Sequence, residues 1–241
     1  MTLFPSRLSC SYIDVVPIGP GHGCVKSSRG WEPRARVTYA DHVRDGPYPI
    51  QVNLHLAQDP ESDSLLSSNP LSIVIGMVLD QQIPLEWAFR GPKELERRLG
   101  APLSAGTLAD LDPEKLTELF ARRPSLHRYP ASMAKRVQAL AVDVAQNYKG
   151  DAANIWKGVG SGRELLNRVK SLPGFGDQKA RIFVALLAKQ LGVRPPGWEE
   201  VATPYSEPGS FRSVADIVDE ASLTQVREFK KSMKAAAASS S

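Results

Sequence analysis

The sequence predicts an all-α protein, and three observations support this fold class. Apolar residues recur every three to four positions over most of the chain from residue 53 onward, which is typical of helices that bury one face. Asn, Asp, Ser and Pro stand where several of these runs begin, as they do at helix starts. Apolar and polar residues never alternate for more than a few positions, so we expect no extended strands.

The first part of the chain does not share this pattern. Residues 1–51 mix Gly, Pro, Arg and Ser without a sustained period and could not bury a continuous face. We therefore expect an irregular or disordered, dispensable extension, followed by one helical domain over residues 52–241. Cys10 and Cys24 match no compact zinc pattern with the nearby histidines, so we expect no metal there.

The central element is expected at residues 70–82. Asn69 and Pro70 suit an N-cap and a first helical position, and the run that follows is apolar nearly all round. We expect the other helices over residues 60–68, 84–89, 92–99, 107–111, 113–122, 130–148, 163–170 and 182–191, with a short turn over 151–157 and a last helix from a Ser222 cap to about residue 237. In that last helix, Lys230, Lys231 and Lys234 should complement the helix dipole.

Composition limits the class of protein. The net charge is +4, with 42% hydrophobic and 23% charged residues, which suits a soluble protein and is compatible with nucleic acid. The longest apolar run is too short to span a membrane, and the N-terminus lacks the pattern of a secretion signal. With 2 cysteines, a reducing cytosol is the default location.

The most informative stretch is residues 171–180. An amphipathic helix leads into Pro173-Gly174-Phe175-Gly176, and a second helix follows, which is the layout of a helix-hairpin-helix. Both glycines can adopt positive φ and let a ligand approach the backbone closely. The first amides of the second helix lack helical partners, so they attract an anion such as a DNA phosphate.

Two stretches in order carry a resemblance to a known family. One is the apolar helix that ends in Asp80-Gln81-Gln82, and the other is the turn at 172–176, with a Lys-Arg helix at 133–137 between them. Together they resemble the helix-hairpin-helix DNA glycosylase superfamily. That superfamily contains endonuclease III and the adenine and alkyl-purine glycosylases. The resemblance covers most of residues 53–192 and is closest to an actinobacterial-type branch of base-excision proteins.

The resemblance implies a two-lobed helical fold that binds double-stranded DNA across a cleft and flips a damaged base out of the stack. Gln81 and Gln82 match the region that contacts DNA or fills the gap left by that base, since an amide can both donate and accept. The alternative is that they only end a helix. The other residues that the resemblance assigns to DNA are Gly174, Phe175, Gly176, Gln178 and Lys179.

One departure from the family concerns the lysine of its lyase members, which stands two residues after the second hairpin glycine. Here that position is Gln178, and Lys179 comes one residue later. One residue rotates a side chain by about 100° around a helix, so Lys179 should not enter the same pocket. We therefore expect no Schiff-base nucleophile, with Lys179 either neutralising a phosphate or solvated.

A second departure concerns the catalytic aspartate, which the family places shortly after the second hairpin helix. No aspartate occurs between Asp177 and Asp216. Asp216 and Glu199 are equal candidates for the catalytic carboxylate, which would stabilise positive charge on the sugar and activate water, and Glu200 follows them. The alternative is that all three are surface carboxylates.

The resemblance also bears on cofactors. No cysteine follows Cys24, so the four-cysteine iron–sulfur cluster of endonuclease III has no ligands here, although the family allows a monovalent cation at the hairpin. We further expect His127 to be a structural loop histidine and Trp87 to lie in the core, while Trp198 could equally stack on a base.

Three hypotheses follow for a monomeric, cytoplasmic, nucleoid-associated protein. The first is a monofunctional DNA N-glycosylase that hydrolyses the bond to a damaged base. The second is a helix-hairpin-helix DNA-binding module that has lost this chemistry. The third is a helical protein–protein adaptor.

Overall fold

The structure is a computed structural model that describes residues 24–27, 30–33 and 53–239. Its contacts divide the chain into two units, Met1–Ile50 and Gln51–Ser241. In the first unit, β1 (Cys24–Ser27) pairs antiparallel with β2 (Gly30–Pro33), with Cys24 opposite Pro33. We expected no strand here, and strands of 4 residues are too short for alternation to show in the sequence. The rest of the expected irregular extension lies outside the described residues.

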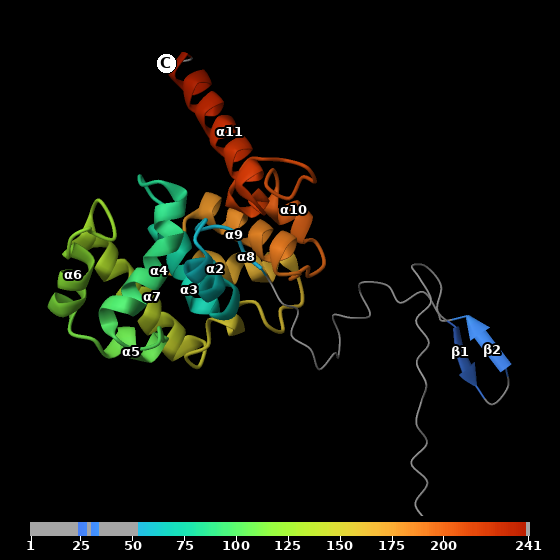
Figure 1. Ribbon diagram of the computed structural model, residues 1–241, viewed down its shortest axis with the longest axis horizontal. Helices are drawn as coiled ribbons and strands as arrows, with labels where there is room; N and C mark the ends of the chain where they lie inside the picture. Colours follow the sequence, from blue (N-terminus) through green and yellow to red (C-terminus); the bar gives the residue numbers. More distant parts are fainter. Residues whose placement is uncertain (1–23, 28–29, 34–52, 240–241) are drawn as a thin grey trace, which may run out of the picture. The chain divides into compact units, whose positions relative to one another are not determined.

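The second unit contains only helices between residues 53 and 239, which confirms the all-α prediction for that part of the chain (Figure 1). Its elements are α2 (Pro60–Ser68), α3 (Pro70–Leu79), α4 (Leu85–Leu99), α5 (Ala105–Asp110), α6 (Pro113–Ala121), α7 (Pro130–Asn147), η1 (Ala152–Ile155), α8 (Gly162–Ser171), α9 (Asp177–Gln190), α10 (Trp198–Ala202), η2 (Val214–Asp216) and α11 (Glu220–Ser239). No helix of the described residues is both long and apolar enough to cross a membrane.

Helix α3 lies at the centre of this unit, as predicted. The side chain of Asn69 accepts a hydrogen bond from the Leu71 amide, and every residue from Leu71 to Leu79 is buried. Helix α4 packs so closely against it that a Cβ on Gly76 would lie 2.5 Å from the ring of Phe89. The absence of a side chain at residue 76 therefore allows the close approach of α3 and α4.

Helix α4 was expected as two elements, and that prediction is wrong. One helix runs through Pro92, whose ring would ordinarily break it at a cost of about 3 kcal/mol. Phe89 and Leu95, on either side of the proline, are both fully buried, and each such side chain contributes about 1.5–3 kcal/mol. Burial of the two flanking side chains therefore outweighs the local penalty.

The remaining helices gather on two sides of α3 and α4. Helices α5 and α6 pack on α7 at one side, while α8, α9, α10 and η2 pack together at the other (Figure 1). Helix α3 contacts both α7 and η1. The C-terminal end of α3 is thereby brought to the turn between α8 and α9.

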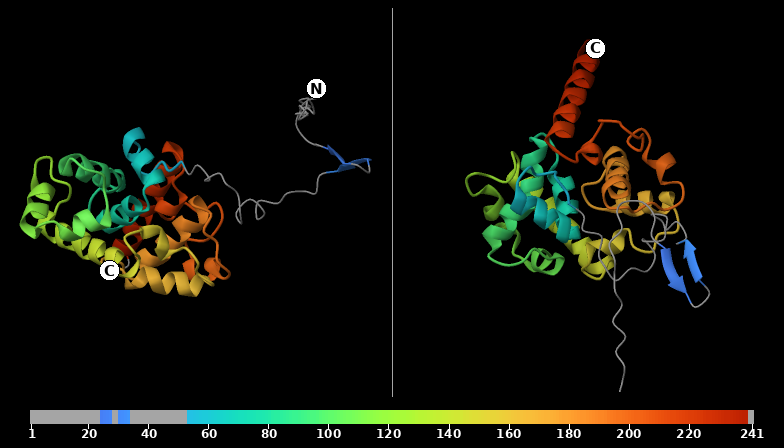
Figure 2. Two further views of the ribbon diagram at one scale, coloured as in Figure 1. Left: turned by 90° about the horizontal axis from the view of Figure 1, so that it is seen from below. Right: turned by 45° about the vertical axis from the view of Figure 1, so that its right-hand side comes forward.

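Helix α11 leaves this body and projects away from it (Figures 1 and 2). It begins at Glu220, and the Asp219 carboxylate accepts the Ser222 amide, so Asp219 rather than Ser222 caps it. Leu223 and Val226 are buried, whereas the second half of the helix is exposed. The helix continues to Ser239, which places no basic residue in its last turn. The prediction that its lysines complement the helix dipole is therefore wrong.

Candidate nucleic-acid interface

The turn between α8 and α9 has the geometry of a tight hairpin, and its two glycines play different parts. Gly174 adopts φ of 89°, the left-handed region that favours glycine, and a Cβ there would lie 3.3 Å from Val78 of α3. Gly176 has φ of −91° and is the N-cap of α9, with nothing within 4 Å of an added Cβ. Of the two glycines that can adopt positive φ, Gly174 does so and Gly176 does not.

The amides of this turn are available to a ligand. The backbone N–H groups of Gly174, Gly176 and Asp177 donate no hydrogen bond within the part of the chain that the structure describes. Gly176 and Asp177 are exposed, so these donors are not covered by other elements. Exposed, unpaired amides at the start of a helix attract an anion.

Charges beside the turn favour the same kind of ligand. The carboxylate of Asp177 accepts from Lys170 at 2.8 Å and from Arg181 at 2.7 Å, and these contacts hold the pKa of Asp177 below its usual value. One carboxylate is therefore shared by two cations at the start of α9. The excess positive charge adds to that of the helix terminus.

Lys179 is not solvated, which corrects one of the two expectations for this residue. Its ammonium donates to the backbone carbonyl of Met77 at 2.6 Å and to that of Val78 at 3.2 Å. Burial lowers the pKa of Lys179 to about 8, with Asp80 opposing the shift and Arg136 adding to it. Lys179 therefore ties the first turn of α9 to the last turn of α3.

Gln81 is held within the protein, whereas Gln82 is open to solvent. The Gln81 amide donates to the Val78 carbonyl at 3.0 Å and accepts from Arg136 at 2.8 Å. Gln82 is exposed, adopts φ of 57°, and its only side-chain partner in the described residues is the Tyr129 hydroxyl at 3.4 Å. Of the two glutamines, Gln82 is the one whose amide group donates to no protein group in the described residues and is exposed to a ligand.

His127 fixes the loop before α7 to the end of α3. Its Nδ1 accepts from the Tyr129 amide at 3.0 Å, so its Nε2 carries the proton and donates to the Gln81 carbonyl at 2.8 Å. Burial lowers the pKa of His127, with the carbonyls of Gln81 and Leu79 opposing the shift. A buried, neutral imidazole with both nitrogens engaged is a structural residue, as the sequence predicted.

Two other residues assigned to DNA have protein partners. The ring of Phe175 is buried against Phe183, with centroids 5.6 Å apart, and its amide donates to the Leu172 carbonyl. Phe175 therefore shapes the turn from the core side. Gln178 is exposed, and its amide donates to the Tyr205 hydroxyl at 2.9 Å.

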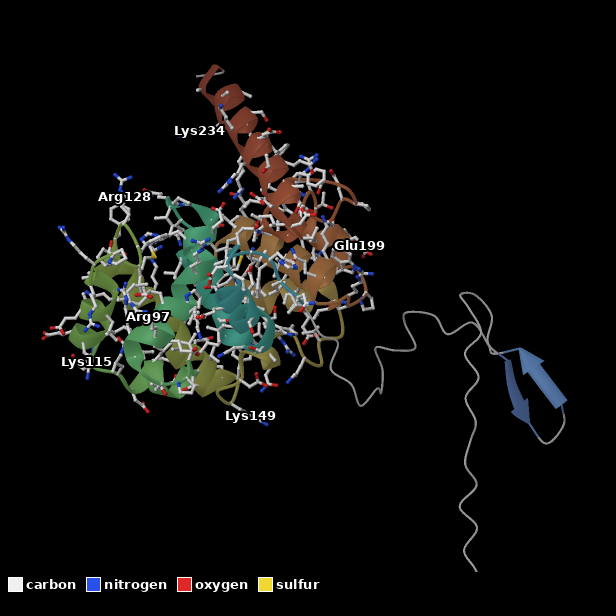
Figure 3. The ribbon with its side chains drawn as sticks, in the orientation of Figure 1. Arg97, Lys115, Arg128, Lys149, Glu199 and Lys234 are labelled. Atoms are coloured by element: carbon white, nitrogen blue, oxygen red, sulfur yellow. The ribbon has the colours of Figure 1, made fainter. Side chains whose placement is uncertain are left out.

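The predicted carboxylates lie in different environments. Asp216 is buried, and one of its oxygens accepts from Lys189 at 2.6 Å while the other accepts from the amides of Arg212 and Ser213. Both oxygens thus hold the loop around η2. Glu199 and Glu200 are exposed on α10, and neither carboxylate has a hydrogen bond within the described residues; Figure 3 labels Glu199 on that side of the protein.

Sequence reasoning missed the carboxylate of Asp80. Asp80 is the C-cap of α3, half-buried, and its carboxylate makes no hydrogen bond or ion pair within the part of the chain described. Asp80 follows Val78 by two residues, and Val78 lies against Gly174 and accepts from Lys179, so Asp80 lies near the hairpin. The Asp80-Gln81-Gln82 run marked a helix end in the sequence, but only the fold brings this residue to α9.

A cavity of about 250 Å³ opens beside Asp80. Its wall is largely apolar, with charged groups at Asp80, at Glu86 of α4 and on α11, where Arg227 pairs with Glu86. The residues that line it are Asp80, Ile83, Pro84, Leu85, Glu86, Leu223, Val226, Arg227 and Lys230. A free carboxylate therefore stands next to an apolar recess.

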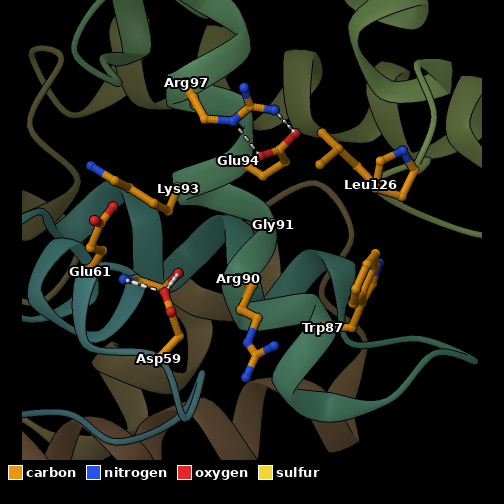
Figure 4. A pocket seen from close by; sticks show the side chains of 11 residues that line it. Asp59, Glu61, Trp87, Arg90, Gly91, Lys93, Glu94, Arg97 and Leu126 are labelled. Atoms are coloured by element: carbon orange, nitrogen blue, oxygen red, sulfur yellow. Dashed lines mark hydrogen bonds and ion pairs between the residues drawn. The ribbon is translucent and has the colours of Figure 1, made fainter.

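A different cavity, of about 330 Å³, lies on α2 and α4 (Figure 4). No residue of the hairpin lines it, and charges of both signs surround it, so it is not part of this interface. Trp87 borders it with 41% of its surface exposed, which makes the prediction of a core tryptophan wrong. Trp198, in contrast, is buried.

Neither a family model nor a curated protein matches the chain. Among the described residues, no three of His, Cys, Asp and Glu gather into a metal-binding group. The interface is therefore defined by its geometry alone: free amides, a cationic helix start and an unpaired carboxylate.

Proposed function

We propose that this protein is a monofunctional DNA N-glycosylase of the helix-hairpin-helix superfamily, acting on a damaged base in double-stranded DNA. The observation that carries the proposal is the exposed turn of Gly174 and Gly176, with its amides unpaired, directly against the end of α3. Such a turn binds a backbone phosphate without reading sequence. Lys170 and Arg181 add positive charge at the same place.

The chemistry that we propose is hydrolysis of the glycosidic bond. The bond between the sugar C1′ and the base nitrogen breaks, its electron pair leaves with the base, and water forms the new bond to C1′. The departing base takes up a proton. Positive charge develops on the sugar during this step, and a nearby carboxylate stabilises it and accepts the proton of the attacking water.

We assign the carboxylate role to Asp80 ahead of the residues proposed from the sequence. Asp80 is unpaired within the described residues and follows by two residues Val78, which lies against Gly174 and accepts from Lys179. Asp216 would have to leave Lys189 and two backbone amides to reach a substrate. Glu199 has a free carboxylate on α10 and is the second candidate.

Lys179 supports a monofunctional enzyme. Its amine is held by two backbone carbonyls of α3, at 2.6 Å from that of Met77 and 3.2 Å from that of Val78. To attack the sugar, the amine would have to leave both carbonyls. We therefore expect no covalent adduct with the sugar.

A second candidate function is a DNA-binding module without chemistry. The ion pair between Asp216 and Lys189 favours it. Among the predicted carboxylates, Asp216 has the sequence neighbours most like those of the family's catalytic aspartate, and its carboxylate is already engaged. The two functions share the hairpin and differ only in whether a carboxylate acts on the sugar.

A panel of duplexes tests both functions. The duplexes carry uracil, alkylated purines, oxidised guanine or mismatched adenine, and alkali cleavage reveals abasic sites. We expect release of one class of base, with no adduct trapped by borohydride. Binding that weakens with salt, without release from any duplex, would support the module instead. Failure to bind any duplex would overturn both.

A further inference from the structure

The feature that the proposed function leaves unexplained is the exposed half of α11. Four basic residues lie on one face of α11: Arg227, Lys230, Lys231 and Lys234. The three lysines follow Arg227 by three, four and seven residues, spacings that return to the same face of a helix. All four are exposed. No acidic residue follows Glu228 in the chain. We call these four residues the cationic face of α11.

The helix itself does not account for this charge. Basic residues stabilise a helix only within its last turn, and the last turn of α11 contains none. Arg227 pairs with Glu86, but Lys230, Lys231 and Lys234 make no ion pair within the described residues. Three neighbouring ammonium groups without counter-charges repel one another and weaken the helix slightly. Their arrangement therefore points to a ligand outside the chain.

The cationic face is continuous with the interface at the hairpin. Arg227 and Lys230 line the same cavity of about 250 Å³ as Asp80. From there the helix runs outward, and Figure 3 shows Lys234 on its projecting part. The face thus begins beside the proposed catalytic carboxylate and extends away from the body.

The chemistry of the face fits a phosphate backbone better than a protein surface. Protein interfaces depend on clusters of aromatic or apolar anchors, whereas beside the cationic face α11 exposes one large apolar side chain, that of Met233. From Arg227 to Lys234 the helix rises about 10 Å, and a DNA duplex carries one negative charge per roughly 1.7 Å of its axis. The three unpaired lysines of this face can therefore each meet a phosphate without reading a base.

We propose that the cationic face of α11 is a second DNA contact, which binds backbone phosphates beside the duplex segment held at the hairpin. This inference rests on the proposed function, since it requires duplex DNA at the hairpin. It adds that α11, which lies outside the stretch resembling the glycosylase superfamily, carries part of the binding energy. The contribution is electrostatic and independent of sequence.

The test measures duplex affinity from 50 to 200 mM salt by fluorescence anisotropy for four full-length proteins. They are the wild type; the triple variant Lys230→Gln, Lys231→Gln and Lys234→Gln; the same three positions changed to Arg; and a control with Lys115→Gln, Lys149→Gln and Lys157→Gln. The control lysines are exposed and carry the same charge, although Lys157 pairs with Asp151, and Figure 3 labels Lys115 and Lys149 far from α11. Gln and Arg match Lys in helix propensity, and circular dichroism checks that α11 is retained.

We expect the Gln variant of α11 to lose about 2–3 units of the slope of log K against log salt, and roughly 10- to 100-fold in affinity at low salt. The Arg variant should keep both, and the control should lose much less of either. An unchanged slope in the α11 Gln variant, or an equal loss in the control, would overturn the inference while leaving the proposed function intact. A wild type that binds no duplex would overturn the proposed function and the inference together.

Discussion

The ammonium of Lys179 lies 2.6 Å from the backbone carbonyl oxygen of Met77, which joins the start of α9 to the end of α3. The end of α3 is also held from a second direction, since His127 donates to the Gln81 carbonyl at 2.8 Å. Carbonyls at the end of a helix lack helical partners, so these side chains supply them. The proposed interface is therefore built on a fixed end of α3 rather than on a free loop.

Lys179 should make stability depend on pH in an unusual direction. Its pKa in the folded protein is about 8, below its ordinary value of 10.5. The charged form of Lys179 therefore lowers the free energy of unfolding, and this loss is fully present below pH 8. Between pH 8 and 10.5 the unfolded chain binds more protons, and the loss disappears. Over this pH range we expect the free energy of unfolding of the wild type to rise by about 1–2 kcal/mol relative to that of Lys179→Gln. Urea denaturation of both proteins measures it. A constant difference between them would contradict the lowered pKa.

The two hairpin glycines should respond differently to alanine. Gly174→Ala requires a side chain at φ of 89° and a methyl group 3.3 Å from Val78, so it should lower the free energy of unfolding by about 1–3 kcal/mol. Gly176→Ala meets nothing within 4 Å and should change stability by less than about 0.5 kcal/mol. Its methyl group would stand where a phosphate approaches, so it should weaken duplex binding several-fold. Thermal unfolding and anisotropy measure the two effects separately.

That difference between the glycines marks a limit of sequence reasoning. The Pro-Gly-x-Gly spacing predicted the turn and the exposed amides, because both depend on local conformation. It could not distinguish Gly174, which faces Val78 of α3, from Gly176, which faces open space. The position of α3 relative to the turn is a long-range contact that no local pattern encodes.

The same distinction applies to the helices and to the carboxylates. Helix α3 was predictable because Asn69 caps it and its residues are uniformly apolar. Helix α4 was not, since the burial of its two flanking side chains overrides the local effect of Pro92. Asp216 was chosen from its neighbours in sequence, whereas its ion pair with Lys189 depends on how α9 packs against η2.

Asp216 should be important for stability. Asp216→Asn leaves the Lys189 ammonium, which is 18% exposed, without its counter-charge, and this should cost about 2–4 kcal/mol of unfolding free energy. Glu199→Gln, at an exposed residue without side-chain partners in the described residues, should change it by less than about 0.5 kcal/mol. Chemical denaturation measures both. Equal stability of Asp216→Asn and the wild type would show that the carboxylate is free for another role.

Asp80 should be important for turnover rather than for stability. Asp80→Asn preserves shape, and its carboxylate makes no hydrogen bond within the described residues, so the fold should be retained. On the duplex that the lesion panel identifies, we expect base release to fall by roughly 10²- to 10³-fold, because the developing charge on the sugar loses its counter-charge. Duplex affinity should stay equal or rise slightly, since a negative charge near the phosphates is removed.

Single-turnover release and anisotropy on the same duplex separate chemistry from binding. Glu200→Gln serves as the matched control, because it removes the same charge from an exposed position on α10, and Glu199→Gln tests the second candidate. Normal release by Asp80→Asn together with its loss in Glu199→Gln would transfer the catalytic role to Glu199, since the hairpin would then be shown to present the sugar to α10 instead of to the end of α3.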